Sequence, residues 1–555
     1  MAELLEERPA DDQELRRDVS VWGSYMWGFA DVGADTYVAL GLVMAFAQGL
    51  TGLAFALAGL VYILVGLAYT ELAAAYPVAG GGQFFAARGL GDFWGFVAGS
   101  ALLLDYTIDI ALFAAMSAGY MNWFAPYLFN LDISHLAVTL GPFREVRWFW
   151  CAETLALIGL LVLLNVRGIR ESSLLNEVVG VAVIATEAGI ILFGFAVAFH
   201  PELVASQWHF DRPSLHNFMY GTSLAIISFV GLESISQAAQ ETRRPATIVP
   251  RTSITLIFTV FIFAVAFSCL GLGVHMPTEH LPANNDMVAN GIIADRIADQ
   301  PWEVLAAHKD NPIARLAGAM PYVGVVAGPL AALLGALVLL ISANSGVMSA
   351  SRLTFSMSRF QFISHWFAQV HRRFRTPVRT IWVFSAIGAV QAILSFLSRD
   401  AIDTMGNMYA FGASTGYALV FVALMRLRII DPFTPRPYKM PGNIRWKRKG
   451  VDYDFPVTAI VGMLGITMIW VMVVLTHEIG RIAGPAWIGL CFVYYAWYRR
   501  KAGLPIFRSV RRDWEREQMR VLAGAEEFDL LEQYRYALAA RSDGPKEPEP
   551  RSGME

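Results

Sequence analysis

Long runs of apolar residues are the feature that most constrains the fold of this chain. About twelve runs approach or exceed the roughly 20 apolar residues that a helix needs to cross a bilayer. These runs cover residues 21–49, 51–75, 93–123, 148–166, 174–200, 217–237, 254–274, 327–350, 380–396, 401–425, 456–475 and 486–498. A helix is favoured inside hydrocarbon because it satisfies its own backbone hydrogen bonds. We therefore predict an all-α membrane protein with about twelve transmembrane helices.

Composition supports this class and excludes others. Hydrophobic types make up 55% of the 555 residues and charged types 16%, with a mean hydropathy of +0.46. A soluble domain carries roughly 25% charged residues, so this chain has too little polar surface to be one. The net charge of −3 gives no reason to expect a nucleic-acid partner. Cys151, Cys269 and Cys491 lie in apolar runs, which predicts buried thiols rather than a disulfide framework.

The distribution of Lys and Arg predicts the orientation. One alternating set of connections is rich in these residues, at 167–170, 243–251, 352–379 and 426–449, whereas the long connection at 274–317 is poor in them. Basic connections stay in the cytoplasm. Both termini are therefore expected in the cytoplasm, on a multi-pass protein of the plasma membrane, and this arrangement fits an even number of spans.

Three regions follow from these patterns. Residues 1–20 carry mixed charges and no apolar core, so we expect a cytoplasmic N-terminal segment and no signal peptide. Residues 21–498 form the membrane domain. Residues 499–555 form a cytoplasmic segment, with one helix over 513–540 and a disordered tail after Ser542. Such a helix can support contacts between two copies of the chain, so a homodimer remains an alternative.

The first apolar run contains two acidic residues, Asp31 and Asp35. Each costs about 2.5–3.5 kcal/mol at the centre of a span, so each needs a reason. The surrounding residues, 28–37, are rich in Gly, Asp and Thr, which favours an unwound stretch in mid-span. Backbone groups freed by unwinding can bind a solute. The alternative is that Asp31 or Asp35 only caps the second half-helix.

The third run contains a second acidic pair, Asp105 and Asp109. Their i, i+4 spacing places both carboxylates on one helical face, where two negative charges repel. The pair is therefore expected to hold a cation or to keep a proton. The alternative is that each carboxylate bonds separately to a neighbouring helix.

The sixth run repeats the pattern of the first, because Val230 and Gly231 precede Glu233 in mid-span. A glycine beside a buried acid indicates a second interruption. It falls five spans after the first one, as an inverted five-plus-five repeat requires.

No mid-span Lys or Arg balances these acids, so the site is expected to prefer positive charge, to carry protons, or both. A monovalent cation at Asp31, Asp35 and Asp105 is one possibility. No metal-ligand cluster or nucleophile–base pair is evident, so we expect neither a resident metal, nor a cofactor, nor an enzyme.

Four motifs now indicate a family. Residues 69–85 (YTEL…YPVAGGGQFF), 229–251 (FVGLE…RP…PR), 344–352 (NSG…SR) and 436–441 (RPYKMP) occur in one order along the chain. They resemble the amino acid–polyamine–organocation (APC) superfamily. The resemblance implies a LeuT-like transporter domain over residues 21–498, with spans 1–5 and 6–10 as inverted repeats and helices 1 and 6 broken.

The resemblance also implies alternating access around a midplane site between spans 1, 3, 6, 8 and 10. The residues expected to bind substrate are Asp31, Gly33, Asp35, Thr36, Tyr37, Asp105, Asp109, Val230, Gly231 and Tyr409. The usual activity is uptake of an amino acid, polyamine or related organocation, driven by a proton gradient or, alternatively, by sodium. Glu233 and Asp109 are the expected proton-coupling groups.

Two departures from the pattern of the superfamily's amino-acid carriers favour a second possible substrate. The glycine bracket that holds a substrate carboxylate in such carriers is replaced by Asp35, Thr36 and Tyr37, and the fifth span lacks the Lys that is frequent there. The proton-coupled potassium importers of the KimA type are similar in both respects, and in Asp105, Glu233 and Tyr409. Asp109, Phe113 and Val230 stand where those importers have hydroxyl side chains, so potassium import remains the alternative.

Overall fold

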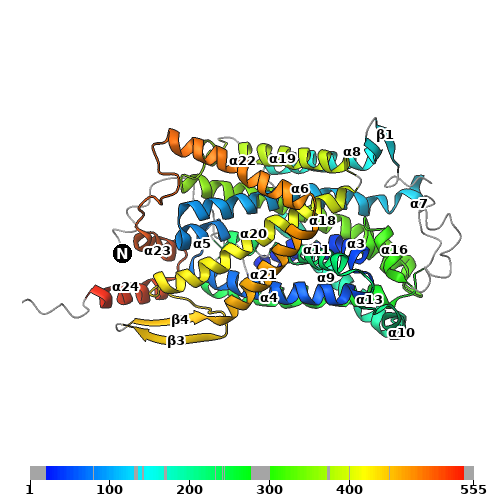
Figure 1. The fold of residues 1–555 in the computed structure, drawn as a ribbon, viewed down its shortest axis with the longest axis horizontal. Helices are drawn as coiled ribbons and strands as arrows, with labels where there is room; N and C mark the ends of the chain where they lie inside the picture. Colours follow the sequence, from blue (N-terminus) through cyan, green and yellow to red (C-terminus); the bar gives the residue numbers. More distant parts are fainter. Residues whose placement is uncertain are drawn as a thin grey trace, which may run out of the picture.

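The computed structural model describes residues 21–542 except 79, 130–135, 141–142, 168–171, 232, 240–241, 243, 277–299, 372–375, 399 and 449–450. The expected N-terminal segment (1–20) and the expected disordered tail therefore lie outside the described residues, as do parts of the connections that carry the Lys/Arg pattern. The spans run side by side along the longest axis of the molecule (Figure 1).

Twelve helices or groups of helices in the described residues correspond to the twelve apolar runs. They are α2 (Val21–Val32) with α3 (Asp35–Ala47), α4 (Thr51–Ala75), α6 (Asp92–Asn122), α8 (Trp148–Arg167), α9 (Ser172–Phe193) with η2 (Gly194–Ala198), α11 (Leu215–Ala225) with η3 (Ile226–Phe229) and α12 (Glu233–Ala238), α13 (Pro245–Gly273), α18 (Gly324–Arg359), α19 (Val378–Phe396), α20 (Ala401–Ile430), α21 (Val457–Thr476) and α22 (Gly480–Lys501).

Length and composition identify ten apolar helical stretches in the described residues that can cross a membrane. The first, Val21–Ala75, has 55 residues. At 1.5 Å per residue it is ~80 Å long, which is enough for two crossings of a ~30 Å hydrocarbon core, so it accounts for two predicted runs. Helix α22 matches the twelfth run but is not among the ten.

The connections contain short helices and two small hairpins. They are η1 (Gln48–Leu50), α5 (Gly81–Leu90), α7 (Ala125–Phe129), β1 (Val138–Leu140), β2 (Phe143–Val146), α10 (Pro201–Gln207), α16 (Pro301–Ala307), α17 (Pro312–Gly318), η5 (His365–Ala368), β3 (Asn443–Arg448), β4 (Val451–Pro456), α23 (Trp514–Gly524) and α24 (Phe528–Ser542). Strands β1–β2 and β3–β4 pair antiparallel. The prediction of an all-α membrane protein is confirmed.

The break in the first span is shorter than predicted. Helix α2 ends at Val32 and α3 begins at Asp35, so only Gly33 and Ala34 are non-helical. The amide of Gly33 donates to the carbonyl of Phe29 over 2.8 Å, and a side chain at Gly33 would clash with that carbonyl. The prediction of an unwound stretch over residues 28–37 is wrong outside Gly33 and Ala34, because residues 28–32 belong to α2 and residues 35–37 to α3.

The break in the sixth span is confirmed. Helix α11 tightens into the 3₁₀ turn η3, which ends at Phe229, and α12 begins at Glu233. Val230 is extended, and Gly231 has φ = +103°, a conformation that favours glycine because it lacks a Cβ. The two breaks lie five spans apart, which is the spacing that the predicted repeat requires.

Helix α6 lies inside the bundle and is buried along almost its whole length. It packs against α18, α20, α19 and α8. Its acidic residues therefore face other helices rather than lipid, which places the polar side chains of the third span beside the two broken helices.

The segment after the last span forms two helices, α23 and α24, rather than the single helix predicted over 513–540. The chain turns at Glu526, which has φ = +58°. The Gln518 side chain receives a hydrogen bond from Arg88 of α5 and donates one to the carbonyl of Ala75, both over 2.9 Å. The segment therefore packs against one end of the bundle (Figure 1).

Candidate functional site

Asp31 lies in the last turn of α2, directly before the first break. The Ser342 hydroxyl of α18 donates to its carboxyl oxygen Oδ1 over 3.3 Å. On the other side, a Cβ at Gly231 would lie 3.1 Å from the Asp31 carboxyl. The missing side chain at Gly231 therefore lets the two broken helices approach each other at this carboxyl.

Asp35 lies in the first turn of α3, beyond the break. Neither carboxyl oxygen has a hydrogen-bond partner among the described residues, although the side chain is buried. The residue at the N-cap of α3 is Ala34, and no side chain caps this helix. The alternative that Asp35 caps the half-helix is therefore wrong. The charged groups that act on it are the other acidic residues of this region, Asp109, Asp31, Asp105 and Glu233.

Asp105 and Asp109 face neighbouring helices at two glycines. A Cβ at Gly412 of α20 would lie 3.1 Å from the amide nitrogen of Asp105, and one at Gly346 of α18 would lie 3.1 Å from the Asp109 carboxyl. Each acidic residue thus sits where the opposite helix has no side chain. One oxygen of each carboxyl has no partner among the described residues, but Asp105 bonds Glu233 of α12 and Asp109 bonds Tyr409 of α20. The alternative that each carboxyl bonds separately to a neighbouring helix therefore remains open.

Glu233 is the first residue of α12 and lies next to the second break. The Tyr417 hydroxyl of α20 donates to its Oε2 over 2.7 Å, whereas Oε1 has no partner among the described residues. Its other direct neighbour is Asp105. The predicted proton-coupling residue therefore links the broken sixth span to α6 and α20.

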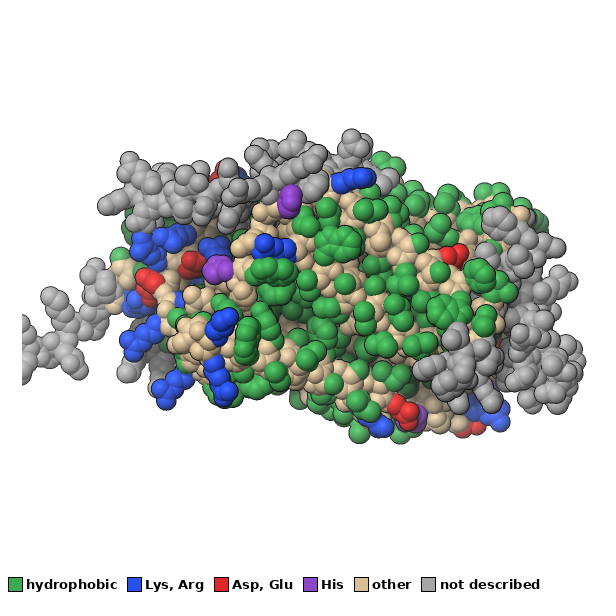
Figure 2. Space-filling view, turned by 90° about the horizontal axis from the view of Figure 1, so that it is seen from above, with side chains coloured by type: hydrophobic (Ala, Val, Ile, Leu, Met, Phe, Trp, Pro, Cys, Tyr) green, Lys and Arg blue, Asp and Glu red, His purple; other side chains and the backbone are tan. Residues whose placement is uncertain are grey.

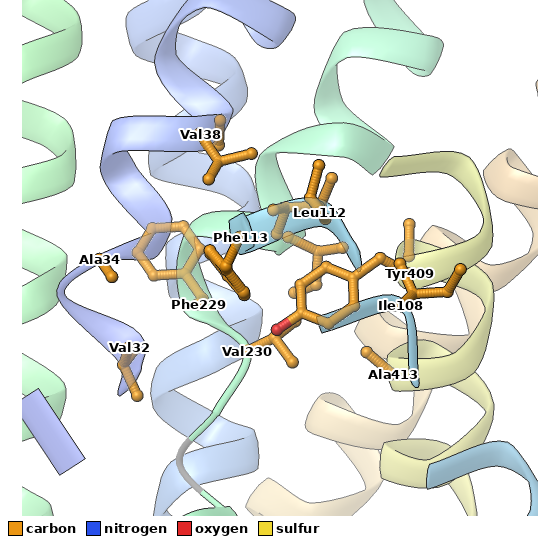
Figure 3. Close-up of a cluster of buried hydrophobic side chains, with 14 of the residues drawn as sticks. Val32, Ala34, Val38, Ile108, Leu112, Phe113, Phe229, Val230, Tyr409 and Ala413 are labelled. Atoms are coloured by element: carbon orange, nitrogen blue, oxygen red, sulfur yellow. The ribbon is translucent and has the colours of Figure 1, made fainter. Parts of the chain in front are cut away.

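Apolar side chains and one tyrosine line the same region. The ring of Phe113 meets that of Tyr409 edge-on, with centroids 6.0 Å apart. In Figure 3 the Tyr409 hydroxyl points toward Val230, at the second break. The Tyr409 side chain also forms a hydrogen bond with the Asp109 carboxyl. Of the sequence-predicted residues, Tyr409 and Val230 therefore lie at the site as expected.

The two remaining predicted residues, Thr36 and Tyr37, lie in the first turn of α3. Thr36 is buried directly after Asp35. Tyr37 faces away from the main acidic group, because its interacting neighbours are Glu187 of α9 and Tyr120 of α6. The Tyr120 hydroxyl donates to the backbone carbonyl of Tyr37 over 3.1 Å. Tyr37 therefore holds the half-helix in place rather than facing the other predicted residues.

Together these contacts gather five carboxyl groups at the two breaks. We call Asp31, Asp35, Asp105, Asp109 and Glu233 the acidic cluster. Each side chain is at most 5% exposed, and no Lys or Arg of the described chain is among the groups that act on them. An unpaired buried charge costs several kcal/mol, so most members must be protonated or must face a bound cation.

In the part of the chain that the structure describes, no three His, Cys, Asp or Glu side chains are grouped as metal ligands. Monovalent cations also take carbonyl and hydroxyl oxygens as ligands, so the expected cation site at Asp31, Asp35 and Asp105 stays a prediction. The arrangement offers protonatable oxygens that several helices bring close to the two breaks.

Sequence reasoning missed two contributors. Tyr417, which bonds Glu233, lies eight residues after Tyr409 on the same helix. Two turns of a helix bring such residues to one face, so the spacing could have found it. Gly412 carries no local signal of its role, because its partner Asp105 is about 300 residues away in the sequence.

A bundle of apolar helices, two of them broken at a buried acidic cluster, defines a membrane transport protein. Comparison with known proteins supports this class. A family model described as amino acid permease matches residues 20–497. The chain therefore belongs to the amino acid permease family, within the APC superfamily, and is a transporter rather than an enzyme.

Relatives of this chain are permeases of several kinds. It is similar to the branched-chain amino acid permease BcaP of Bacillus subtilis, with 25% identity over 78% of this chain and 85% of that one. It is 26% identical to cationic amino acid transporter 4 of Mus musculus, over 76% and 61% of the two chains. The low-affinity putrescine importer PlaP of Escherichia coli is 22% identical, over 87% and 94%.

Proposed function

We propose that this protein imports a small organic cation, either a polyamine or an amino acid with a basic side chain, together with a proton. The observation that carries the proposal is the acidic cluster at the two helix breaks, which has no basic partner in the described chain. A cation that binds among these carboxyl groups supplies the missing positive charge. A neutral or anionic solute does not.

The half-helix ends favour the same class of substrate. The N-terminus of a half-helix carries partial positive charge and normally faces an anionic group of the substrate. Here Asp35 lies in the first turn of α3 and places a carboxyl group of the protein there. A substrate carboxylate would meet this carboxyl group at the end of the helix. An amine would be attracted by it.

Proton coupling follows from the number of carboxyl groups. One or two ionised members of the cluster are enough to neutralise a small organic cation, and the others must keep protons because they are buried without a counter-ion. Glu233 is the proposed proton carrier, since it bonds Tyr417 on one side and faces Asp105 on the other. A proton that enters along a potential of 100 mV releases ~2.3 kcal/mol, which can drive accumulation.

The relatives support the substrate class without fixing it. Their names include a putrescine importer and a cationic amino acid transporter, and also a branched-chain amino acid permease. Only the first two kinds of substrate match an acidic site. Potassium import, the alternative from the sequence, gains no support from these relatives.

The test is uptake by purified protein in proteoliposomes with an inward proton gradient. Labelled putrescine, lysine, leucine and rubidium are compared, with and without a protonophore. We expect putrescine or lysine to accumulate, and we expect the protonophore to abolish accumulation. Accumulation of leucine alone, or of rubidium alone, would contradict the proposal.

A matched pair of variants links the result to the site. Asp109→Asn removes a member of the acidic cluster, and we expect at least a tenfold loss of uptake. Glu153→Gln changes a carboxyl group of α8 that accepts a bond from Asn122 and lies outside the cluster. It should retain most of the activity.

A further inference from the structure

The last helix, α22, has an open groove on its outer face. The groove has a volume of about 620 Å³. Its walls are formed by Phe492, Val493, Ala496, Trp497, Arg500 and Lys501. Figure 2 views the molecule from the side on which α22 lies, and it shows a broad hydrophobic surface with Lys and Arg gathered at one end. The groove therefore combines apolar walls with a basic end.

The apolar part of the groove is continuous with the lipid-facing surface of α22. Ile482, Leu490, Val493 and Trp497 are all more than half exposed. Helix α22 has 22 residues and is therefore ~33 Å long, close to the ~30 Å thickness of the hydrocarbon core. The residues after Trp497 therefore fall at the level of lipid headgroups.

Aromatic rings form one side of this surface. Phe492 lies 6.1 Å from Phe507 and 6.2 Å from Phe93, measured between ring centroids. The Lys501 ammonium lies 5.2 Å from the centroid of the Trp497 ring, which holds it at the end of the groove. Trp and Lys in this arrangement are typical of a membrane–water interface.

The basic residues at this end fall into two groups. Arg499 and Arg512 both bind the buried carboxylate of Asp92 and are used inside the protein. The other members are Arg500, Lys501, Arg508 and Arg511, which are exposed and form no ion pair with any residue that the structure describes. Two of these, Arg500 and Lys501, line the groove itself and place two uncompensated positive charges at its basic end.

We propose that the groove on α22 binds one anionic phospholipid, with its phosphate between Arg500 and Lys501 and an acyl chain along Val493 and Trp497. Charge complementarity and continuity with the lipid-facing surface select this occupant. A second copy of the chain fits less well. In a dimer with its two-fold axis along the membrane normal, the basic ends of both copies meet at one level and repel each other.

The test is native mass spectrometry of the detergent-purified protein with added phosphatidylglycerol or phosphatidylcholine. The wild-type protein should retain phosphatidylglycerol in preference. Each Lys or Arg contributes roughly fivefold to attraction by an anionic surface, so Arg500→Gln with Lys501→Gln should weaken retention at least about tenfold. The matched control is Arg445→Gln with Lys447→Gln, which removes two exposed charges from strand β3 and should retain the lipid.

Three results would overturn the proposal. The first is equal retention of both lipids by the wild-type protein, and the second is unchanged retention by the Arg500/Lys501 variant. The third is an efficient disulfide crosslink between two copies through Val493→Cys in liposomes that contain phosphatidylglycerol, because that crosslink would show a second copy in the groove. Absence of the crosslink together with loss of lipid from the variant is the expected outcome.

Discussion

The buried ion pair between Glu71 and Arg428 gives a direct test of how the bundle is held together. Arg428 donates from Nε to one carboxyl oxygen over 2.6 Å and from Nη2 to the other over 2.5 Å. The amide of Met440 adds a third bond to Glu71, over 2.8 Å. The carboxylate is fully buried and the guanidinium is only 2% exposed. The pair therefore joins α4, α20 and the loop after α20.

Substitution of one partner leaves the other charge buried. Arg428→Met removes the two-pronged bond, and the nearest remaining cation is Arg436, whose Nε lies 3.5 Å from Glu71. Loss of one member of a buried pair costs about 3–5 kcal/mol, and the remaining contact with Arg436 places the expected loss near ~3 kcal/mol. Glu71→Gln combined with Arg428→Met should recover most of this loss, because no charge is then left unpaired.

The assay is equilibrium unfolding by SDS in mixed micelles, applied to the wild-type protein, both single variants and the double variant. The double-mutant cycle isolates the pairwise free energy of unfolding. A loss below ~1 kcal/mol in Arg428→Met, or additive losses in the double variant, would refute the reasoning.

Three further predictions follow from local contacts. Burial lowers the pKa of His477 to about 4, below its usual 6.5. Between these two pH values the unfolded state binds more protons than the folded state, so the free energy of unfolding falls as pH falls. In SDS unfolding, a shift from pH 7 to pH 5 should therefore cost the wild-type protein about 2 kcal/mol more than it costs His477→Asn. Gly231→Ala should reduce uptake at least tenfold, since its φ is +103° and its Cβ would crowd Asp31, whereas Gly503→Ala, with φ = +68° and open space around it, should not. Gln518→Ala should make the C-terminal helices more sensitive to limited trypsin digestion; unchanged digestion would contradict their attachment through this side chain.

The fold was largely predictable because its determinants are local. Twelve apolar runs predict twelve spans, and the glycines beside Asp31 and Glu233 predict the two breaks. The position of each helix end was less predictable. Gly33 closes the first break within two residues, so Asp35 and Tyr37 are helical. Gly524 precedes the turn at Glu526 that divides the C-terminal helix, a stop signal that is common at helix ends.

The site was predictable only in part, because its geometry depends on distant residues. Buried carboxyl groups are conspicuous in an apolar run, so all five members of the acidic cluster could be found from the sequence. Their glycine partners could not, since Gly346 and Gly412 meet Asp109 and Asp105 only after the chain has folded. Tyr37 was assigned to the site from its place in a motif, whereas its ring packs edge-on against that of Tyr120, with centroids 5.5 Å apart.

The central claim is that Glu233 carries the coupled proton while the rest of the acidic cluster holds the organic cation. The most direct measurement compares Glu233→Gln with the wild-type protein in proteoliposomes, by uptake under a proton gradient and by counterflow exchange of the same labelled substrate without a gradient. We expect the variant to lose gradient-driven accumulation and to retain exchange. Full gradient-driven accumulation by Glu233→Gln would contradict the claim.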